Sequence, residues 1–135
     1  GLVGCEEDEI EVDYSSTYPF SGEWHVTESG FYGDYGPYWL YIYNTAADNG
    51  EEIWVENIWD SEIKVRANVT GENAFSVDQG EDISGNVSLV TIENGKVNGD
   101  NISFKAYLYG VDSVGTITDT FDIIDVTGTR KTGFE

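Results

Sequence analysis

Apolar and polar residues alternate with a period of two along most of the chain. In residues 63–70 and 102–109, every second residue is apolar and most residues between them are polar. This alternation is typical of a β-strand that places one face against a core. Shorter runs of the same character cover residues 24–27, 38–44, 53–56, 75–77, 87–92 and 117–129. The pattern predicts about eight short strands and no amphipathic helix.

Turn-forming residues separate these runs. Asn-Gly pairs at 49–50, 94–95 and 98–99 predict tight hairpin turns, because both residue types tolerate the left-handed backbone conformation. Pro19 and Pro37 are expected just before strands, where a missing N–H does not interrupt a ladder. Sequential hairpins of this number predict an all-β fold, either an antiparallel up-and-down barrel or a sandwich. Closure into a barrel would remove the exposed edges that a sandwich must protect.

Charge excludes some partners. The 135 residues, a length typical of one domain, include 26 acids and 6 bases, which gives a formal net charge of −20. Nucleic-acid binding is not expected, because it requires Lys and Arg against the phosphates. Docking on anionic lipids through a basic patch is excluded for the same reason. The charge indicates a soluble, self-repelling surface or an acidic face that captures a ligand.

The N-terminal segment has the features of a processing signal. Leu2-Val3-Gly4-Cys5 resembles a bacterial lipobox, so we expect Cys5 to carry a lipid. Six acids follow within residues 6–13, and we expect residues 1–17 to form a flexible tether before a β-domain at 18–135. An acidic run in this position resembles the surface-export signal of Bacteroidetes lipoproteins, although it would serve equally as a solvated spacer. The resemblance implies an outer-membrane lipoprotein facing the cell exterior, with the periplasmic face as the alternative.

The chain offers few residues for catalysis or metal binding. One cysteine, Cys5, and one histidine, His25, exclude an internal disulfide and a zinc site, and no metal or cofactor is expected. His25 follows Trp24, so alternation directs it away from any interior cavity, and no Gly-x-Ser-x-Gly motif is present. We therefore predict no catalytic residue. The acids considered for glycosidase or calcium chemistry, and interpreted as solvated strand and loop positions, are Glu52, Glu56, Asp78, Glu81, Asp82, Asp119, Asp122 and Asp125.

Aromatic residues concentrate at residues 31–38, Phe-Tyr-Gly-Asp-Tyr-Gly-Pro-Tyr. We expect this segment to be a loop in which Tyr32, Tyr35 and Tyr38 cover an apolar ligand, since buried apolar area supplies affinity. The same side chains would also suit stacking on sugar rings, or simple packing of the barrel end. On the following run, Trp39, Tyr41 and Tyr43 share one face, so that strand is apolar on both faces.

Two motifs at opposite ends of the chain resemble those of lipocalins and related calycins. Gly22 and Trp24 open the first strand as Gly-x-Trp, and Arg130 lies in the last strand. In calycins such an arginine packs across the first-strand tryptophan, so we predict contact between Trp24 and Arg130. More broadly, residues 18–24, 41–45, 92–97 and 128–134 are similar to a family of Bacteroidetes lipoproteins described as lipid-binding putative hydrolases. That resemblance implies an eight-stranded calycin-like barrel.

These observations lead to one functional hypothesis and two alternatives. We expect a membrane-anchored lipoprotein that binds a small hydrophobic, lipid-like ligand inside the barrel without covalent chemistry. The alternatives are a surface module for glycans or proteins, with a barrel filled by side chains, and a hydrolase. The sequence does not indicate whether the protein forms oligomers. The residues expected to contact the ligand, besides the three tyrosines, are Ile53, Val55, Ile63, Val65, Ala67, Ile102, Phe104 and Ala106.

Overall fold

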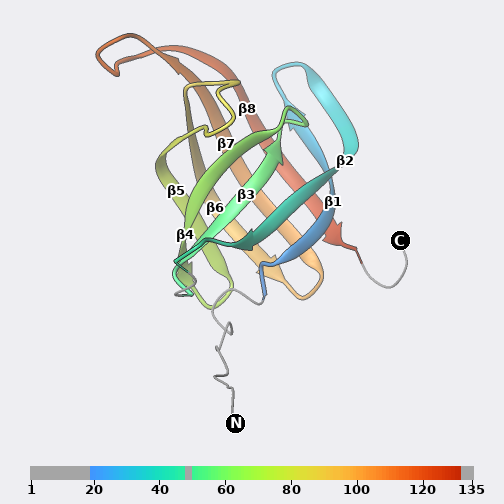
Figure 1. Cartoon of the computed structure of the whole chain (residues 1–135). Helices are drawn as coiled ribbons and strands as arrows, with labels where there is room; N and C mark the ends of the chain where they lie inside the picture. The colour runs from blue at the N-terminus through green and yellow to red at the C-terminus, as the bar shows by residue number, and fades with distance from the viewer. Residues whose placement is uncertain (1–18, 48–49, 132–135) are drawn as a thin grey trace.

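The chain folds into a closed barrel of eight antiparallel strands that follow one another in sequence order (Figure 1). The computed structural model describes residues 19–47 and 50–131. The strands are β1 Gly22–Gly30, β2 Gly33–Asn44, β3 Glu52–Ile58, β4 Ile63–Gly71, β5 Ala74–Glu81, β6 Leu89–Asn98, β7 Asn101–Val111 and β8 Ile117–Arg130. The predicted all-β, up-and-down barrel is confirmed. No helix of the described residues is long and apolar enough to cross a membrane.

Pairing of the first and last strands closes the barrel. β1 pairs with β2 on one side and with β8 on the other, from Trp24 opposite Arg130 to Ser29 opposite Asp125. Side chains then alternate as the sequence pattern predicts: Trp24 and Val26 face inward, whereas His25 is exposed outside. Closure therefore leaves every strand paired on both edges, which protects the sheet against pairing with other chains.

One apolar core fills the interior. Every strand contributes buried side chains, and Phe20 and Val87 add to them from outside the strands. Three aromatic rings continue this core, with Phe20 against Phe75 at 5.7 Å and Phe75 against Phe104 at 5.9 Å between centroids, in edge-to-face geometry. The eight apolar residues expected to line a cavity all belong to this core, and each is at most 4% exposed.

One end of the barrel, the sealed end, is closed by Phe20, Trp24 and Arg130. The Arg130 guanidinium lies over the Trp24 ring at 4.2 Å from its centroid, which confirms the predicted contact. The same guanidinium donates to the carbonyl oxygens of Ser21 and of Pro19, and the Trp24 indole N–H donates to the Phe20 carbonyl at 2.9 Å. Gly22 suits this site because its φ is +144° and a Cβ would lie 3.1 Å from the guanidinium.

The opposite end, the open end, carries the connections β1–β2, β3–β4, β5–β6 and β7–β8 (Figure 1). Here the prediction of an aromatic loop at residues 31–38 is wrong, because β2 begins at Gly33 and only Phe31 and Tyr32 form the turn. Pro37 therefore lies within β2 rather than before it. An extra residue between Tyr35 and Tyr38 makes a β-bulge opposite Val26 and Glu28, where a missing N–H is tolerated.

The Asn-Gly pairs behave in two ways. Gly99, with φ +65°, lies in the tight turn between β6 and β7 as predicted. The turn predicted at Asn94-Gly95 is wrong, because both residues lie inside β6 at a register shift in which Asn94 has φ +58°. A bulge and a tight turn both require a left-handed residue, so the pair does not distinguish them.

Some predicted features lie outside the described residues. They include Cys5, the tether at 1–17, Tyr18 of the β-domain, Asn49 of the first Asn-Gly pair and residues 132–134 of the C-terminal motif. Lipidation of Cys5 and the domain limits at 17 and 18 stay predictions.

Candidate functional site

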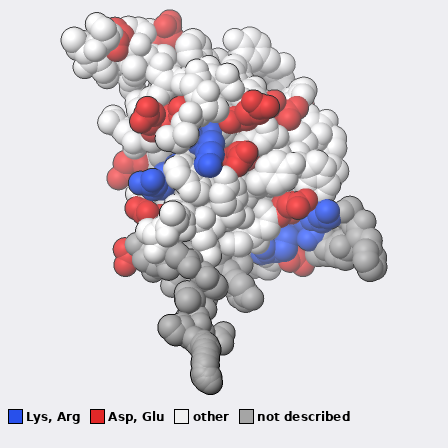
Figure 2. Space-filling view, viewed as in Figure 1, with Lys and Arg blue, Asp and Glu red and all other residues white. Residues whose placement is uncertain are grey.

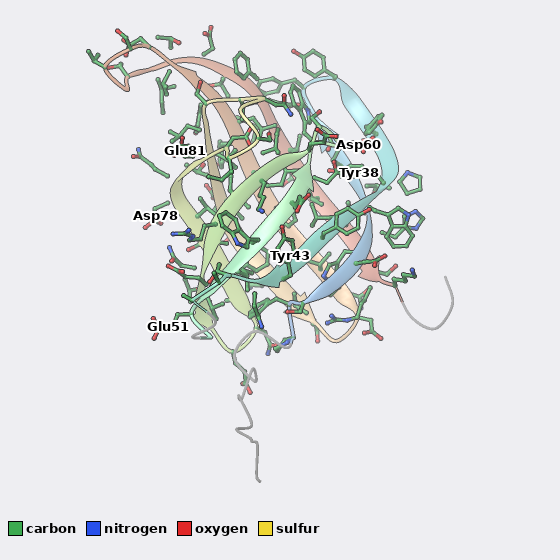
Figure 3. The ribbon with its side chains drawn as sticks, in the orientation of Figure 1. Tyr38, Tyr43, Glu51, Asp60, Asp78 and Glu81 are labelled. Atoms are coloured by element: carbon green, nitrogen blue, oxygen red, sulfur yellow. The ribbon has the colours of Figure 1, made fainter. Side chains whose placement is uncertain are left out.

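A pocket of about 270 Å³, here called the mouth pocket, lies at the open end of the barrel. It is lined by the β1–β2 hairpin, the β3–β4 turn and β8. Figure 3 shows Tyr38 and Asp60 at this end, on adjacent elements. The lining residues are Glu28, Tyr32, Gly33, Asp34, Tyr35, Trp59, Ser61 and Asp122. An outer groove of about 420 Å³ shares Glu28, Asp34 and Tyr35 with it, so the pocket continues toward the barrel exterior.

Asp122 organises one wall of the mouth pocket. This carboxylate is 2% exposed and comes from the inward face of β8. It accepts hydrogen bonds from the Trp59 indole N–H at 2.9 Å and from the Phe31 backbone N–H at 2.7 Å, besides that of Ile123. Asp122 therefore connects three elements of the open end, since Trp59 belongs to the β3–β4 turn and Phe31 to the β1–β2 turn.

Glu28 is a second buried carboxyl group in the same pocket. It is 6% exposed, and its Oε1 accepts a hydrogen bond from the Tyr38 hydroxyl at 2.7 Å. Burial raises the pKa of Glu28 above its ordinary value of 4.5; Asp122 and Asp60 raise it further, and the Tyr38 hydrogen bond opposes them. Burial, followed by the bond to Glu28, also raises the pKa of Tyr38, so the phenol stays a donor.

Trp59 forms another wall from an unusual backbone position. Its φ is +65°; Asp60 and Glu62 in the same turn, and Asn57 near the end of β3, also have positive φ. A bulky residue in the left-handed region is a genuine outlier, and such conformations concentrate at functional sites. The Asn57 amide holds the turn, because it donates to the Trp39 carbonyl at 2.7 Å and its oxygen accepts from the Glu62 N–H at 3.0 Å.

Two tyrosines border the pocket from the β1–β2 hairpin. Tyr32 is 80% exposed and Tyr35 is 54% exposed. The Tyr35 hydroxyl donates to Asp60 at 2.6 Å, so this ring spans from the hairpin to the β3–β4 turn. The Asp60 carboxylate raises the pKa of Tyr35 through this bond. Aromatic surface is thus available to a ligand at the rim.

The structure divides the predicted ligand residues into two groups. Tyr32 and Tyr35 line the mouth pocket, and Tyr38 reaches it through its bond to Glu28. The eight apolar residues from β3, β4 and β7 do not line this pocket and pack in the core instead. Their part in ligand binding stays a prediction.

Six of the eight lining residues were not predicted from the sequence to contact a ligand, and the most buried carboxylates among them are Glu28 and Asp122. Asp122 stood out only as one of many acids, and Trp59 carried no signal. A signal for both acids was present in the alternation of β1 and β8. Glu28 continues the inward series after Trp24 and Val26, and Asp122 precedes Ile124 and Val126 in the same way. An acid in phase with a core-facing series indicates a functional position, because acids are rarely buried without a partner.

The mouth pocket does not bring a serine nucleophile and a histidine base together. Ser61 lines the pocket, but its hydroxyl donates to the Trp59 carbonyl at 2.9 Å. His25 lies on the barrel exterior, where its ring stacks on Trp39 at 4.5 Å. No group of three acidic, histidine or cysteine side chains among the described residues is arranged to hold a metal ion. The arrangement favours binding over serine–histidine hydrolysis.

A second aromatic surface lies on the outside of β2 and β3. Lys64 and Arg66 lie over the Trp54 ring, at 4.5 and 5.0 Å from its centroid, and Lys64 also approaches Tyr43 at 5.5 Å. Figure 2 shows Lys and Arg side chains on this wall of the barrel. Since cations already occupy these rings, the wall is less available for ligand stacking than the open end.

The sequence matches the model of a known protein family. The family model described as "Lipid-binding putative hydrolase" matches residues 9–135, which includes every strand of the barrel. No curated protein matches the chain.

Proposed function

The chain belongs to the family of lipid-binding putative hydrolases, and we propose that it holds one end of a small lipid-like molecule in the mouth pocket without covalent chemistry. The observation that carries this proposal is the contrast between the two barrel ends. Trp24 and Arg130 seal one end, whereas the other holds a pocket of about 270 Å³ with aromatic walls. The side-chain core between them directs the ligand to the open end rather than to the interior.

The size and lining of the pocket fit part of a lipid. Small-molecule sites in proteins begin at roughly 300 Å³ and are mainly apolar, with a few placed polar groups. The mouth pocket, at about 270 Å³, is just below that range, so it suits a headgroup or a short stretch of chain. Exposed Phe31 and Tyr32 on the adjoining turn offer apolar contact for the remainder.

A binding measurement with matched variants tests the proposal. Calorimetric titration of the full chain with short-chain alkyl lipids would compare Tyr32→Ala/Tyr35→Ala with Tyr41→Ala/Tyr43→Ala. The second pair removes exposed tyrosines from the outer wall of β2 and serves as the control. We expect the first pair to weaken binding about tenfold or more, because aromatic contacts contribute on the order of 1 kcal/mol each. Equal affinity in both double variants would contradict the proposal.

One observation favours a second candidate function. Phe31, Tyr32 and Tyr35 are all more than half exposed on one hairpin, as expected for a surface that contacts a glycan or a protein. Binding of oligosaccharides, with no binding of alkyl lipids, in the same titration would favour this candidate.

We also propose that Cys5 carries a lipid anchor at the outer membrane, facing the cell exterior. The Leu2-Val3-Gly4-Cys5 motif supports this proposal, and the periplasmic face is the alternative. Pro19 and Phe20 lie at the sealed end, so an anchor before them would leave the mouth pocket accessible. Membrane fractionation of the full precursor and of Cys5→Ala tests the anchor. Protease treatment of intact cells then distinguishes the two faces.

A further inference from the structure

The mouth pocket has a strong charge bias. Three of its eight lining residues are acids, Glu28, Asp34 and Asp122, and none is Lys or Arg. Asp60 adds a fourth carboxylate at the rim through its bond to Tyr35. In Figure 2, acidic side chains border the upper end of the molecule, whereas Lys and Arg lie lower, over the wall and toward the sealed end. The potential inside the pocket is therefore negative.

The two buried acids have no cation beside them. Glu28 is 6% exposed and Asp122 is 2% exposed. Among the residues that the structure describes, the ion pairs are Arg130–Asp100 and Lys131–Glu23, both at the other end of the barrel. Buried charges in proteins are normally paired, because removing an ion from water costs several kcal/mol. The raised pKa of Glu28 is consistent with a missing positive partner.

The walls of the pocket suit an organic cation better than a metal ion. Tyr32, Tyr35 and Trp59 present aromatic rings to the same space as the carboxylates. Ring faces attract ammonium groups, and this contact is strongest for desolvated quaternary ammonium on Trp and Tyr. No set of three ligating side chains in the described part of the chain is placed for a metal ion.

Resting on the proposed function, we propose that the mouth pocket selects lipids whose polar end carries a positively charged amine. The ammonium group fills the space between the Glu28 and Asp122 carboxylates and the Trp59 and tyrosine rings. The alkyl part leaves through the open side toward Phe31. A fatty acid binds more weakly, because the same carboxylates repel its negative end.

A series of ligands that share one alkyl chain tests this selection. Decyltrimethylammonium, decanol and decanoate would be titrated below micelle-forming concentration at about 0.15 M salt, where long-range attraction to the acidic surface is screened. Tetramethylammonium, which lacks the chain, distinguishes a lipid from a free amine. We expect decyltrimethylammonium to bind about tenfold tighter than decanol, decanoate to bind more weakly than decanol, and tetramethylammonium to bind at least tenfold more weakly than the decyl cation.

Two matched variants test whether the preference for the cation arises in the mouth pocket. Glu28→Gln removes the carboxylate that accepts from Tyr38, and Glu56→Gln removes one that accepts from Tyr43 on the outer wall, at 2.5 Å. Each variant loses one negative charge and keeps an acceptor for its tyrosine. We expect Glu28→Gln to reduce the preference for the cation over decanol to below about threefold. Glu56→Gln should retain the full preference.

The outcomes separate this inference from the proposed function. If decanol binds and the cation is not preferred, the inference is wrong and the lipid site stands. An equal preference in both variants would assign the effect to net charge and would also overturn the inference. If tetramethylammonium binds as tightly as the decyl cation, the alkyl chain contributes nothing, and the inference that the pocket selects a lipid rather than a free amine is wrong. If none of the four compounds binds, the inference and the proposed function both fail.

Discussion

Replacing Arg130 with alanine is expected to weaken the barrel where its first and last strands meet. The guanidinium lies 4.2 Å from the centre of the Trp24 ring, and the side chain is only 20% exposed. It also donates to the Pro19 carbonyl at 2.6 Å and to the Ser21 carbonyl. Alanine removes these contacts together and leaves the two carbonyl groups without this donor.

The magnitude follows from the separate contacts. A largely desolvated cation–π contact contributes about 1–2 kcal/mol. Two hydrogen bonds from a charged donor contribute about 1.5 kcal/mol each at the lower end of their range. The ion pair with Asp100 adds little, because that carboxylate is 66% exposed. We expect the free energy of unfolding to fall by about 4–5 kcal/mol, and Tm by about 15–20 °C for a domain of this size.

Urea unfolding followed by circular dichroism and tryptophan fluorescence measures this loss. Lys131→Ala is the matched control, because Lys131 lies 6.0 Å from the Trp39 centroid and pairs with half-exposed Glu23 at 3.4 Å. That exposed pair should contribute less than about 1 kcal/mol. Arg130→Lys should recover only part of the loss, since lysine lacks the planar fork. If Arg130→Ala costs no more than Lys131→Ala, the guanidinium does not hold the barrel ends together.

Three further predictions concern other parts of the barrel. Asp82 accepts from the backbone N–H groups of Val87 and Lys64 and from Ser84; burial alone would raise its pKa, but these bonds lower it below the ordinary 3.8. Asp82→Ala should therefore lower the free energy of unfolding by about 2–4 kcal/mol at pH 7, measured by urea unfolding. The difference between the variant and the native chain should shrink as the pH falls below 3.8, the ordinary pKa of an aspartate. A difference that stays constant with pH would contradict this prediction. Glu28 has the opposite sign: its raised pKa makes its contribution greatest below pH 4.5 and smaller as pH rises through the folded-state value. As the pH rises from acid to neutral, Glu28→Gln should become more stable relative to the native chain. Thermal unfolding at several pH values measures this difference, and Tm curves of the two proteins that run parallel with pH would contradict the prediction. Leu108→Ala, at a fully buried position, should cost about 2–5 kcal/mol, whereas half-buried Leu89→Ala should cost clearly less; equal losses in urea unfolding would contradict this.

The fold could be predicted from local patterns because long stretches of the strands alternate between buried and exposed residues, with interruptions only at bulges and strand ends. The inward series of β4 and β7 were predictable residue by residue, since a half-buried strand has a period of two. The contact of Trp24 with Arg130 was predictable from the resemblance of the two ends to calycins. The Asn94-Gly95 pair was not, because a left-handed residue serves a bulge as well as a turn, and only pairing across strands decides between them.

The candidate site was less predictable than the fold. Tyr32 and Tyr35 were identified from the aromatic segment, but the segment itself is a hairpin strand rather than a loop. The pocket depends on Glu28, Trp59 and Asp122. Trp59 follows Glu28 by 31 residues, and Asp122 follows Trp59 by 63 residues. Among the acids of the described strands, Glu28 and Asp122 continue a core-facing series and are buried at the open end, and the closed topology brings them together.

The central claim is that a lipid-like ligand binds at the open end and not within the barrel. A decyltrimethylammonium analogue with a photoreactive diazirine at the chain terminus or beside the headgroup would be crosslinked to the protein, and the modified residues identified by peptide mass spectrometry. The headgroup probe is predicted to label the β1–β2 hairpin around Tyr32 and Tyr35 and the β3–β4 turn at Trp59. Competition by unlabelled ligand should remove this labelling. Competed labelling of core positions such as Ile63 and Phe104 would contradict the account, because it would place the ligand in the interior.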